Sequence, residues 1–221
     1  MLPVLDSLDR LLTTYVKNCG SEEFDTACAS LRIKEICRNS HLALKEAHTS
    51  YNGLSKVEIY GLTGESLVLK PDHFSIRYFA GGTWNKCCDY ILLTEFRGSR
   101  YAYFVDLKTN LSENPDADDV LTQDDDYDID IAWQMHGANR LLNSLFDVLH
   151  TERGIARAEL DSFTRKYAIF YKGVKKMPSK ATTGMVHATT GISRPRAKEI
   201  NDFIYAIKAS SNQRFAFDSL L

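Results

Sequence analysis

Three charged residues in the middle of the chain have the types and the spacing that metal-assisted hydrolysis needs. Asp89 stands near the start of a predicted strand, Cys88–Phe96, and Asp106 and Lys108 end the next predicted strand, Tyr101–Lys108. Two carboxylates at one site repel each other unless a cation or a proton intervenes. Lys108 supplies one positive charge, and a divalent ion with oxygen ligands would supply more. Such a site suits hydrolysis of phosphodiester bonds, because the ion polarises the phosphate and lowers the pKa of a bound water.

The register of the predicted hairpin decides whether these residues meet. A turn centred on Gly98-Ser99 pairs the two strands so that Asp89 lies opposite Lys108. Residues that lie opposite each other share a face of the sheet, and so do residues two apart on one strand. Asp106 is then a diagonal neighbour of Asp89, about 7–8 Å away at the backbone. We therefore expect both carboxylates and the lysine on one face.

An alternative interpretation applies to the second strand alone. An acid two residues before a lysine also arises by chance, so Asp106-Leu107-Lys108 by itself is typical of a solvated strand end. The paired Asp89 on the same face is what favours a site. A metal-dependent phosphatase with a chance motif is a further alternative, which the lack of a histidine-rich metal-binding set disfavours.

Hydrophobic periodicity and turn residues predict the elements that hold these residues. We expect helices at Leu2–Lys17, about Glu23–His48, Ile131–Leu149 and from Pro195 to about Ser210, and strands at Val57–Leu62, Ser66–Leu69, His73–Phe79 and Tyr167–Tyr171. Thr63-Gly64-Glu65 should join the first two of these strands as a hairpin. The fold class predicted is α/β (α+β), one mixed central β-sheet flanked by helices.

The chain length of 221 residues suits one domain. We expect an N-terminal helical region at 1–50, a core at about 55–175, and a C-terminal basic loop and helix at 175–221. Hydrophobic residues make up 44% of the chain, and no apolar run is long enough for a membrane span. Met1–Lys17 lacks the features of a secretory signal, and the five cysteines form no CxxC pair, so we expect a cytoplasmic protein with buried thiols.

Charge is distributed unevenly although the net charge is only -2. Acids without bases fill Glu113–Asp130, which we interpret as a mobile loop and, alternatively, as a regulatory or partner-binding segment. Bases without acids fill Arg165–Lys180. Four of these bases are candidates for contacts with a nucleic-acid backbone, and a solvated loop is the alternative. These candidates are Lys172, Lys175, Lys176 and Lys180.

The hairpin sequence resembles the PD-(D/E)xK nuclease superfamily, which has the restriction-endonuclease-like fold. The likeness rests on Asp89 followed by Asp106-Leu107-Lys108 at a strand end, and the segment looks like members associated with bacterial defence. It extends weakly to Trp133-Gln134 and covers under half of the chain. The proline that often precedes the first acid is replaced by Cys88, a departure that many members share.

The resemblance implies a role for each matched residue. Asp89 and Asp106 would ligate Mg²⁺, which Mn²⁺ could replace, and Leu107 would contribute its backbone carbonyl. Lys108 would position the attacking water. The family often adds an acid from the preceding helix, and Glu46 is our candidate.

Weaker candidates complete the implied site. Glu35 is the alternative to Glu46, and a solvated helix face is the competing interpretation for either acid. Gln134 is a candidate on the following helix, although Ala138 stands where related nucleases have a tyrosine. An ordinary surface amide is equally compatible with Gln134, and we expect His136 at the surface.

The function implied is that of a magnesium-dependent DNA endonuclease in defence against foreign or phage DNA. A homodimer or a partner protein of a defence system is expected, because a lone nuclease of this size often needs one to cut both strands. The alternatives are an RNA-cleaving nuclease and a non-catalytic module that binds nucleic acid or protein. The charged set disfavours that module, because buried like charges are costly without a function.

Overall fold

The structure is a computed structural model that describes residues 3–15, 30–33, 41–45, 54, 56–71, 87–112, 129–175 and 204–221. Its elements are α1 (Pro3–Tyr15), β1 (Ser30–Ile33), β2 (His41–Lys45), β3 (Lys56–Tyr60), β4 (Ser66–Leu69), β5 (Tyr90–Phe96), β6 (Ser99–Ser112), α2 (Ile129–Arg153), α3 (Arg157–Leu160), β7 (Thr164–Lys175), β8 (Ile204–Lys208), β9 (Gln213–Ala216) and the 3-10 helix η2 (Phe217–Leu220). The protein is a mixed α and β structure, as expected from the sequence.

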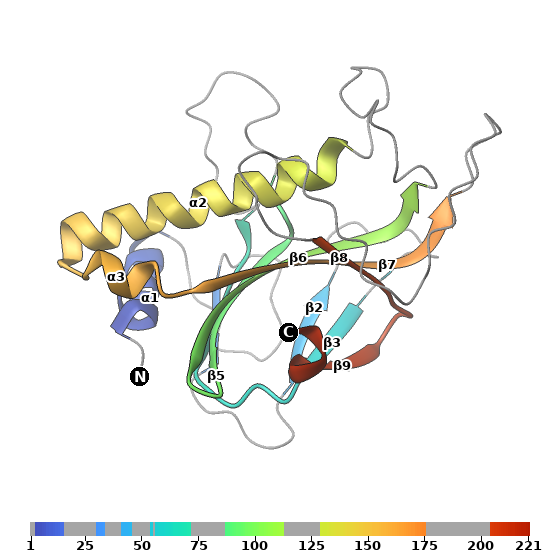
Figure 1. Ribbon diagram of the computed structural model, residues 1–221, viewed down its shortest axis with the longest axis horizontal. Helices are drawn as coiled ribbons and strands as arrows, with labels where there is room; N and C mark the ends of the chain where they lie inside the picture. Colours follow the sequence, from blue (N-terminus) through green and yellow to red (C-terminus); the bar gives the residue numbers. More distant parts are fainter. Residues whose placement is uncertain are drawn as a thin grey trace.

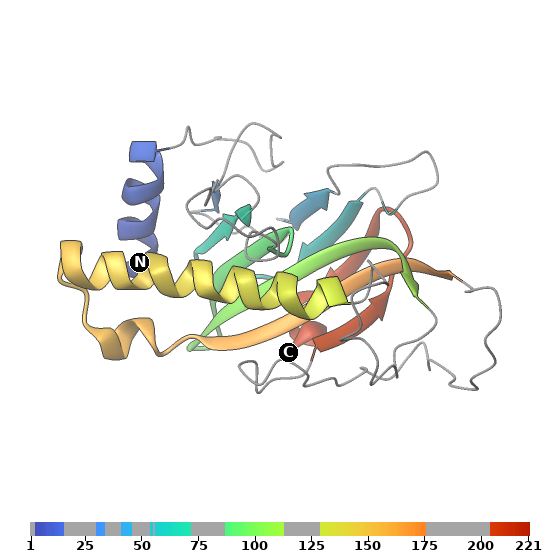
Figure 2. The same ribbon diagram turned by 90° about the horizontal axis from the view of Figure 1, so that it is seen from above.

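The described strands form a larger and a smaller sheet. The larger sheet has the order β1-β4-β5-β6-β7-β8, and β1, β4, β5 and β6 pair antiparallel. From β6 onward the pairing is parallel, because α2 carries the chain back between β6 and β7 (Figure 2). The smaller sheet, β2-β3-β9, lies on the side of the larger sheet opposite α2 (Figure 1).

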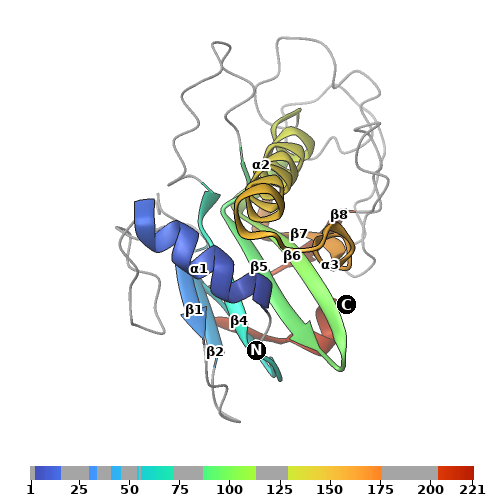
Figure 3. The same cartoon turned by 90° about the vertical axis from the view of Figure 1, so that its left-hand side faces the viewer.

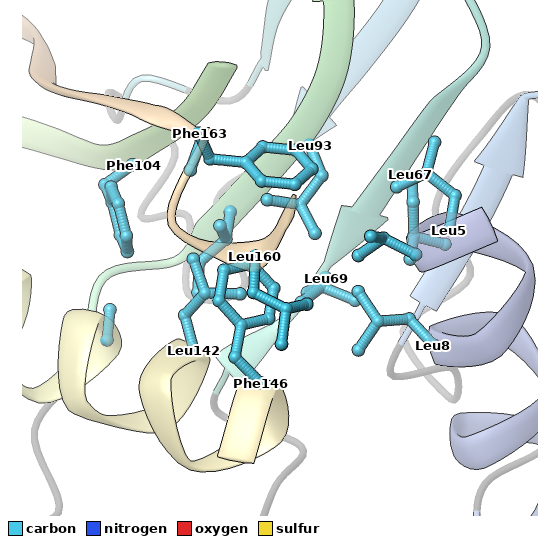
Figure 4. Packing of buried hydrophobic residues seen from close by; sticks show 14 of the residues in the cluster. Leu5, Leu8, Leu67, Leu69, Leu93, Phe104, Leu142, Phe146, Leu160 and Phe163 are labelled. Carbon is cyan, nitrogen blue, oxygen red and sulfur yellow. The ribbon is translucent and has the colours of Figure 1, made fainter. Parts of the chain in front are cut away.

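Apolar side chains cover both faces of the larger sheet. The helix-side core joins the sheet to α1, α2 and α3 (Figures 3 and 4), and its members include Leu5, Leu8, Leu69, Leu93, Phe104, Leu142, Phe146, Leu160 and Phe163. The sheet-side core joins the opposite face to the smaller sheet and η2, and its members include Leu42, Ile59, Leu92, Tyr103, Val105, Leu107, Phe170 and Phe217. Burial on both faces explains the nearly continuous apolar run along β6.

The two cores identify which face each strand residue occupies. On β6, Ala102 and Phe104 belong to the helix-side core, whereas Tyr103 and Val105 belong to the sheet-side core. Successive strand side chains alternate between faces. Asp106 therefore lies on the face that α2 covers.

The predicted N-terminal helical region is wrong beyond its first helix. The helix expected at Leu2–Lys17 is confirmed as α1, but residues 30–33 and 41–45 are strands. The sequence Leu42-Ala43-Leu44 favours a helix by intrinsic propensity. Pairing of β2 with β3 and burial of Leu42 and Leu44 in the sheet-side core outweigh that propensity.

The helix predicted to reach Ser210 is also wrong in its described part. Residues Ile204–Lys208 form β8, which pairs in parallel with β7. Ile207 packs against the sheet-side core. A pairing with a distant strand is a tertiary effect that local periodicity does not reveal.

The hairpin predicted around Thr63-Gly64-Glu65 is also wrong. Both strands exist as β3 and β4, but they belong to different sheets. Gly64 passes so close to β5 that a Cβ atom there would lie 2.4 Å from the carbonyl oxygen of Glu95. The chain crosses from one sheet to the other at this point.

Other predicted elements are confirmed or fall outside the described residues. The strands around the central turn, the long helix and the strand at Tyr167–Tyr171 are confirmed as β5, β6, α2 and β7. The strand predicted at His73–Phe79, nearly all of the acidic segment and residues 176–200 lie outside the described part of the chain. None of the helices in the described part is long and apolar enough to cross a membrane.

Candidate active site

The turn of the central hairpin differs from the predicted one. Phe96 pairs with Ser99, so the turn consists of Arg97 and Gly98 alone. Both residues have positive φ, 51° at Arg97 and 78° at Gly98. Two-residue hairpin turns of this kind match the twist of the flanking strands. The turn predicted at Gly98-Ser99 was one residue too late, which shifts the register by two.

The shift changes the neighbours of Asp89 but not its face. Tyr90 pairs with Val105, so Asp89 comes level with Asp106 and not with Lys108. Because side chains alternate with a period of two, a shift of two keeps every residue on its expected face. Asp106 keeps its expected face, and Asp89, which precedes β5, lies close enough for the charge of Asp106 to raise its pKa.

Asp89 also terminates the pairing of β5 with β6. Its Oδ2 atom accepts a hydrogen bond of 2.6 Å from the backbone N–H of Leu107. β5 begins only at Tyr90, so the carboxylate takes the place of a strand partner for this N–H. The bond fixes Asp89 against the Asp106-Leu107-Lys108 segment.

Asp106 is the most buried member of the site. Its exposure is 1%, and its Oδ2 atom lies 2.9 Å from Nζ of Lys108. The Lys108 side chain is 28% exposed. The ion pair of Asp106 and Lys108 within β6 therefore connects a buried carboxylate to solvent.

Among the described residues, the site contains two acids and one base. The pKa of Asp89 is raised to about 8, first by burial and next by the charge of Asp106. The N–H of Leu107 and the charge of Lys108 lower this pKa but do not offset the rise. The nearby carboxyl group of Asp106 therefore favours the protonated form of Asp89. One lysine therefore does not neutralise this pair, and a further cation would be stabilised here.

The first turns of α2 are anchored beside Asp89. The backbone N–H of Cys88 donates to the carbonyl of Gln134 over 3.1 Å. The side-chain Oε1 of Gln134 is buried and has no hydrogen-bond partner among the described residues. The structure thus places the backbone of Gln134 beside Cys88, the residue before Asp89.

Two further side chains, His136 and Cys88, are buried, the first against expectation and the second as the sequence predicted. His136, expected at the surface, is only 5% exposed. It shares the inner side of α2 with Met135 and Ala138, so its exposure was misjudged from its polar type. The Cys88 thiol is fully buried and donates to the carbonyl of Tyr90, and burial raises its pKa well above the usual range. A thiol in that state is a poor nucleophile and a poor metal ligand.

Glu46 was chosen because a helix was predicted to carry it, and the structure does not show that helix at residues 41–45. Glu46 and Glu35 lie outside the described residues, but the preceding segment, 41–45, is a strand and not the predicted helix. The Lys45 backbone contacts the Tyr90 hydroxyl through both its N–H, at 3.1 Å, and its carbonyl. Tyr90 belongs to the sheet-side core, on the face opposite Asp106.

The predicted basic segment is only partly described. Arg165 is a structural residue, because its guanidinium donates to the side-chain oxygens of Asn139 and Asn143, each at 2.6 Å. Lys172 is exposed on β7, and alternation places it on the face opposite Asp106. Lys175 ends β7, and its side chain is outside the described part, as are Lys176 and Lys180 altogether.

The donors of the site are oxygens, the type that Mg²⁺ and Mn²⁺ prefer. Among the described residues, no group of three or more histidines, cysteines and acids could hold a metal ion. Asp89 and Asp106 would need further oxygen ligands, such as the predicted backbone carbonyl of Leu107 and water. The pair fits a hydrated Mg²⁺, which is commonly bound by one or two carboxylates.

Comparison of the chain with protein-family models, with curated proteins and with solved structures finds no match.

Proposed function

We propose that this protein is a divalent-metal-dependent nuclease that hydrolyses phosphodiester bonds in DNA. The observation that carries the proposal is the neighbouring pair Asp89 and Asp106, beside which the described residues place one base, Lys108. Two like charges buried together destabilise a fold, and a bound cation would offset their repulsion.

Each residue of the proposed site has a role that follows from its position. Asp89 and Asp106 would hold Mg²⁺ or Mn²⁺, which supplies charge stabilisation and a water of lowered pKa when bound. The Leu107 N–H holds Asp89 in place. Lys108, partly exposed and beside Asp106, orients the attacking water or stabilises the charge that develops on the phosphate.

The proposal includes the restriction-endonuclease-like fold and the PD-(D/E)xK superfamily. The order of elements supports it: the antiparallel strands β4, β5 and β6 are followed by α2 and then by β7, parallel to β6. The acids stand where β5 begins and where β6 leaves its antiparallel partner. This is the arrangement that the resemblance of the hairpin sequence implies.

Defence against foreign or phage DNA in the cytoplasm is the proposed setting, with a homodimer or a partner protein to cut both strands. Lys175, Lys176 and Lys180 are the proposed contacts with the nucleic-acid backbone. Gln134 is proposed to approach the metal ligands or the substrate from α2, because its buried oxygen lies beside the anchor at Cys88.

One observation favours a second candidate, a non-catalytic module that binds nucleic acid. A proton on Asp89 and the ion pair of Asp106 with Lys108 can together satisfy the site without a metal. Such a module would bind nucleic acid equally well in magnesium and in EDTA.

The test is a cleavage panel on the full chain. Supercoiled plasmid, single-stranded DNA and single-stranded RNA are each incubated with magnesium, manganese, calcium or EDTA. Cleavage of DNA with magnesium or manganese, lost in EDTA and in Asp106→Asn, is expected. Asp161→Asn, an exposed acid paired with Arg157, is the matched control and should keep full activity. Cleavage of RNA alone would replace the proposed substrate, and binding without cleavage of either would favour the non-catalytic module.

A further inference from the structure

A row of three residues crosses the parallel part of the larger sheet at the level of Lys108. Lys108 pairs with Tyr171 of β7, and Tyr171 pairs with Lys208 of β8. Partners in register on neighbouring strands lie side by side on one face. The topology thus brings together two lysines that are 100 positions apart in the sequence.

The face of this row follows from its neighbours. Phe170 and Ile207 pack in or against the sheet-side core, so alternation places Tyr171 and Lys208 on the other face. That face is the one on which Tyr167 and Ile169 join the helix-side core. Lys208 therefore lies on the same face as Asp106 and Lys108.

Exposure increases from the acids toward Lys208. Asp106 is 1% exposed, the Lys108 side chain is 28% exposed, and Lys208 is exposed. Tyr171, which lies between the two lysines, is buried. Lys208 forms no ion pair within the described part of the chain. The row lies where β8 ends at Lys208, while β6 and β7 continue their pairing to Ser112 and Lys175.

We propose that Lys208 is a substrate-positioning residue that binds a backbone phosphate next to the one hydrolysed. The inference rests on the proposed nuclease function. Two strand spacings separate Lys208 from Lys108, about 10 Å at the backbone. That distance suits a second phosphate of the same strand. Lys208 contributes affinity and register, while Lys108 acts at the scissile phosphate.

The test compares Lys208→Ala and Lys208→Arg with the control Lys166→Ala. Lys166 is a partly buried lysine of β7 that alternation places on the opposite face. Binding of a short fluorescein-labelled DNA duplex and of its single strand is measured by anisotropy in calcium over a range of salt. Steady-state cleavage is measured in magnesium.

Lys208→Ala should weaken binding and raise KM about fivefold with kcat unchanged, which is the effect of one exposed charged contact. The log–log salt slope for the duplex should fall by about 0.9. Lys208→Arg should restore both, and Lys166→Ala should match the wild type. A wild type that cuts DNA while Lys208→Ala keeps its KM and salt slope overturns the inference alone. A wild type that neither binds nor cuts DNA overturns the proposed function and this inference with it.

Discussion

The protein buries two groups of charged side chains, and their charges are balanced in opposite ways. In the smaller sheet, Glu58 is buried between two bases, with Lys56 and Arg214 each 2.6 Å from its carboxylate. In the larger sheet, the described residues place one base, Lys108, beside the two acids Asp89 and Asp106. In the first group two bases balance one acid, whereas in the second Asp89 retains a proton unless a further cation replaces it. This difference separates a group that joins strands from one suited to binding a cation.

The largest expected difference between the two groups is catalytic. Lys108→Ala should lower kcat by about 10²–10³, because it removes a charge directed at the reacting phosphate. Lys56→Ala removes the corresponding base of the structural group and should leave kcat unchanged. Circular dichroism should show the same fold for both variants. A Lys108→Ala enzyme with wild-type turnover would contradict the role assigned to this lysine.

Of the two groups, divalent ions should stabilise only the one that contains Asp89 and Asp106. At a hundred times its dissociation constant, Mg²⁺ or Mn²⁺ should raise the free energy of unfolding by about 2.7 kcal/mol, seen as a higher Tm. Asp106→Asn should abolish the rise, whereas Glu58→Gln should keep it. A rise that survives in Asp106→Asn would place the ion elsewhere.

The two groups should also respond oppositely to removal of a carboxylate charge. Between about pH 4 and 8 the folded protein retains the proton of Asp89 that the unfolded chain has lost, so the stability of the metal-free protein falls as pH rises. Asp89→Asn keeps an acceptor for the Leu107 N–H and should remove this fall, with a gain of about 1–3 kcal/mol at pH 8. Glu58→Gln should lose about 1–2 kcal/mol, because it leaves two bases without their acid.

Chemical denaturation at several pH values in EDTA measures both variants. At pH 4 Asp89→Asn and the wild type should be nearly equally stable, since Asp89 is then protonated in the folded state. Equal stabilities at pH 8 as well would mean that the two aspartates do not compete for charge.

The smallest expected effect belongs to the C-terminal basic segment. Neutralising Lys175, Lys176 and Lys180 should weaken DNA binding, and each lost phosphate contact should reduce the log–log salt slope by about one. The stabilisation by magnesium should not change. Titration of a labelled duplex at several salt concentrations provides the slope, and an unchanged slope would identify the segment as a solvated loop.

The sequence predicted the central hairpin and α2 because their signals are local. The apolar strands around Gly98 and the periodic face of Met135, Ala138 and Leu142 carry their own pattern. The proximity of Asp89 and Asp106 was predictable even with a register error of two, since a shift of two keeps the strand residues on their expected faces. Positive φ at Arg97, which decided the register, is unusual for a residue other than glycine.

The errors fall where distant parts of the chain determine the structure. β2 and β8 are short apolar segments whose strand partners, β3 and β7, lie elsewhere in the sequence. A short apolar run is compatible with either a helix or a strand until its partner is known. For the same reason the sequence did not predict that Lys208 lies near Lys108. Lys208 lies in a segment predicted as a helix, and β7 separates it from Lys108 in the sheet.

Nicking of supercoiled plasmid by the wild type and by Asp106→Asn, at equal protein concentration in magnesium, tests the central claim most directly. The wild type should convert the plasmid to open-circular and linear forms, and EDTA should stop the reaction. Asp106→Asn should leave the plasmid supercoiled, because one of the two carboxylates proposed to hold the metal is then uncharged. Equal nicking by both proteins would contradict the assignment of Asp89 and Asp106 as the centre of a metal-dependent nuclease.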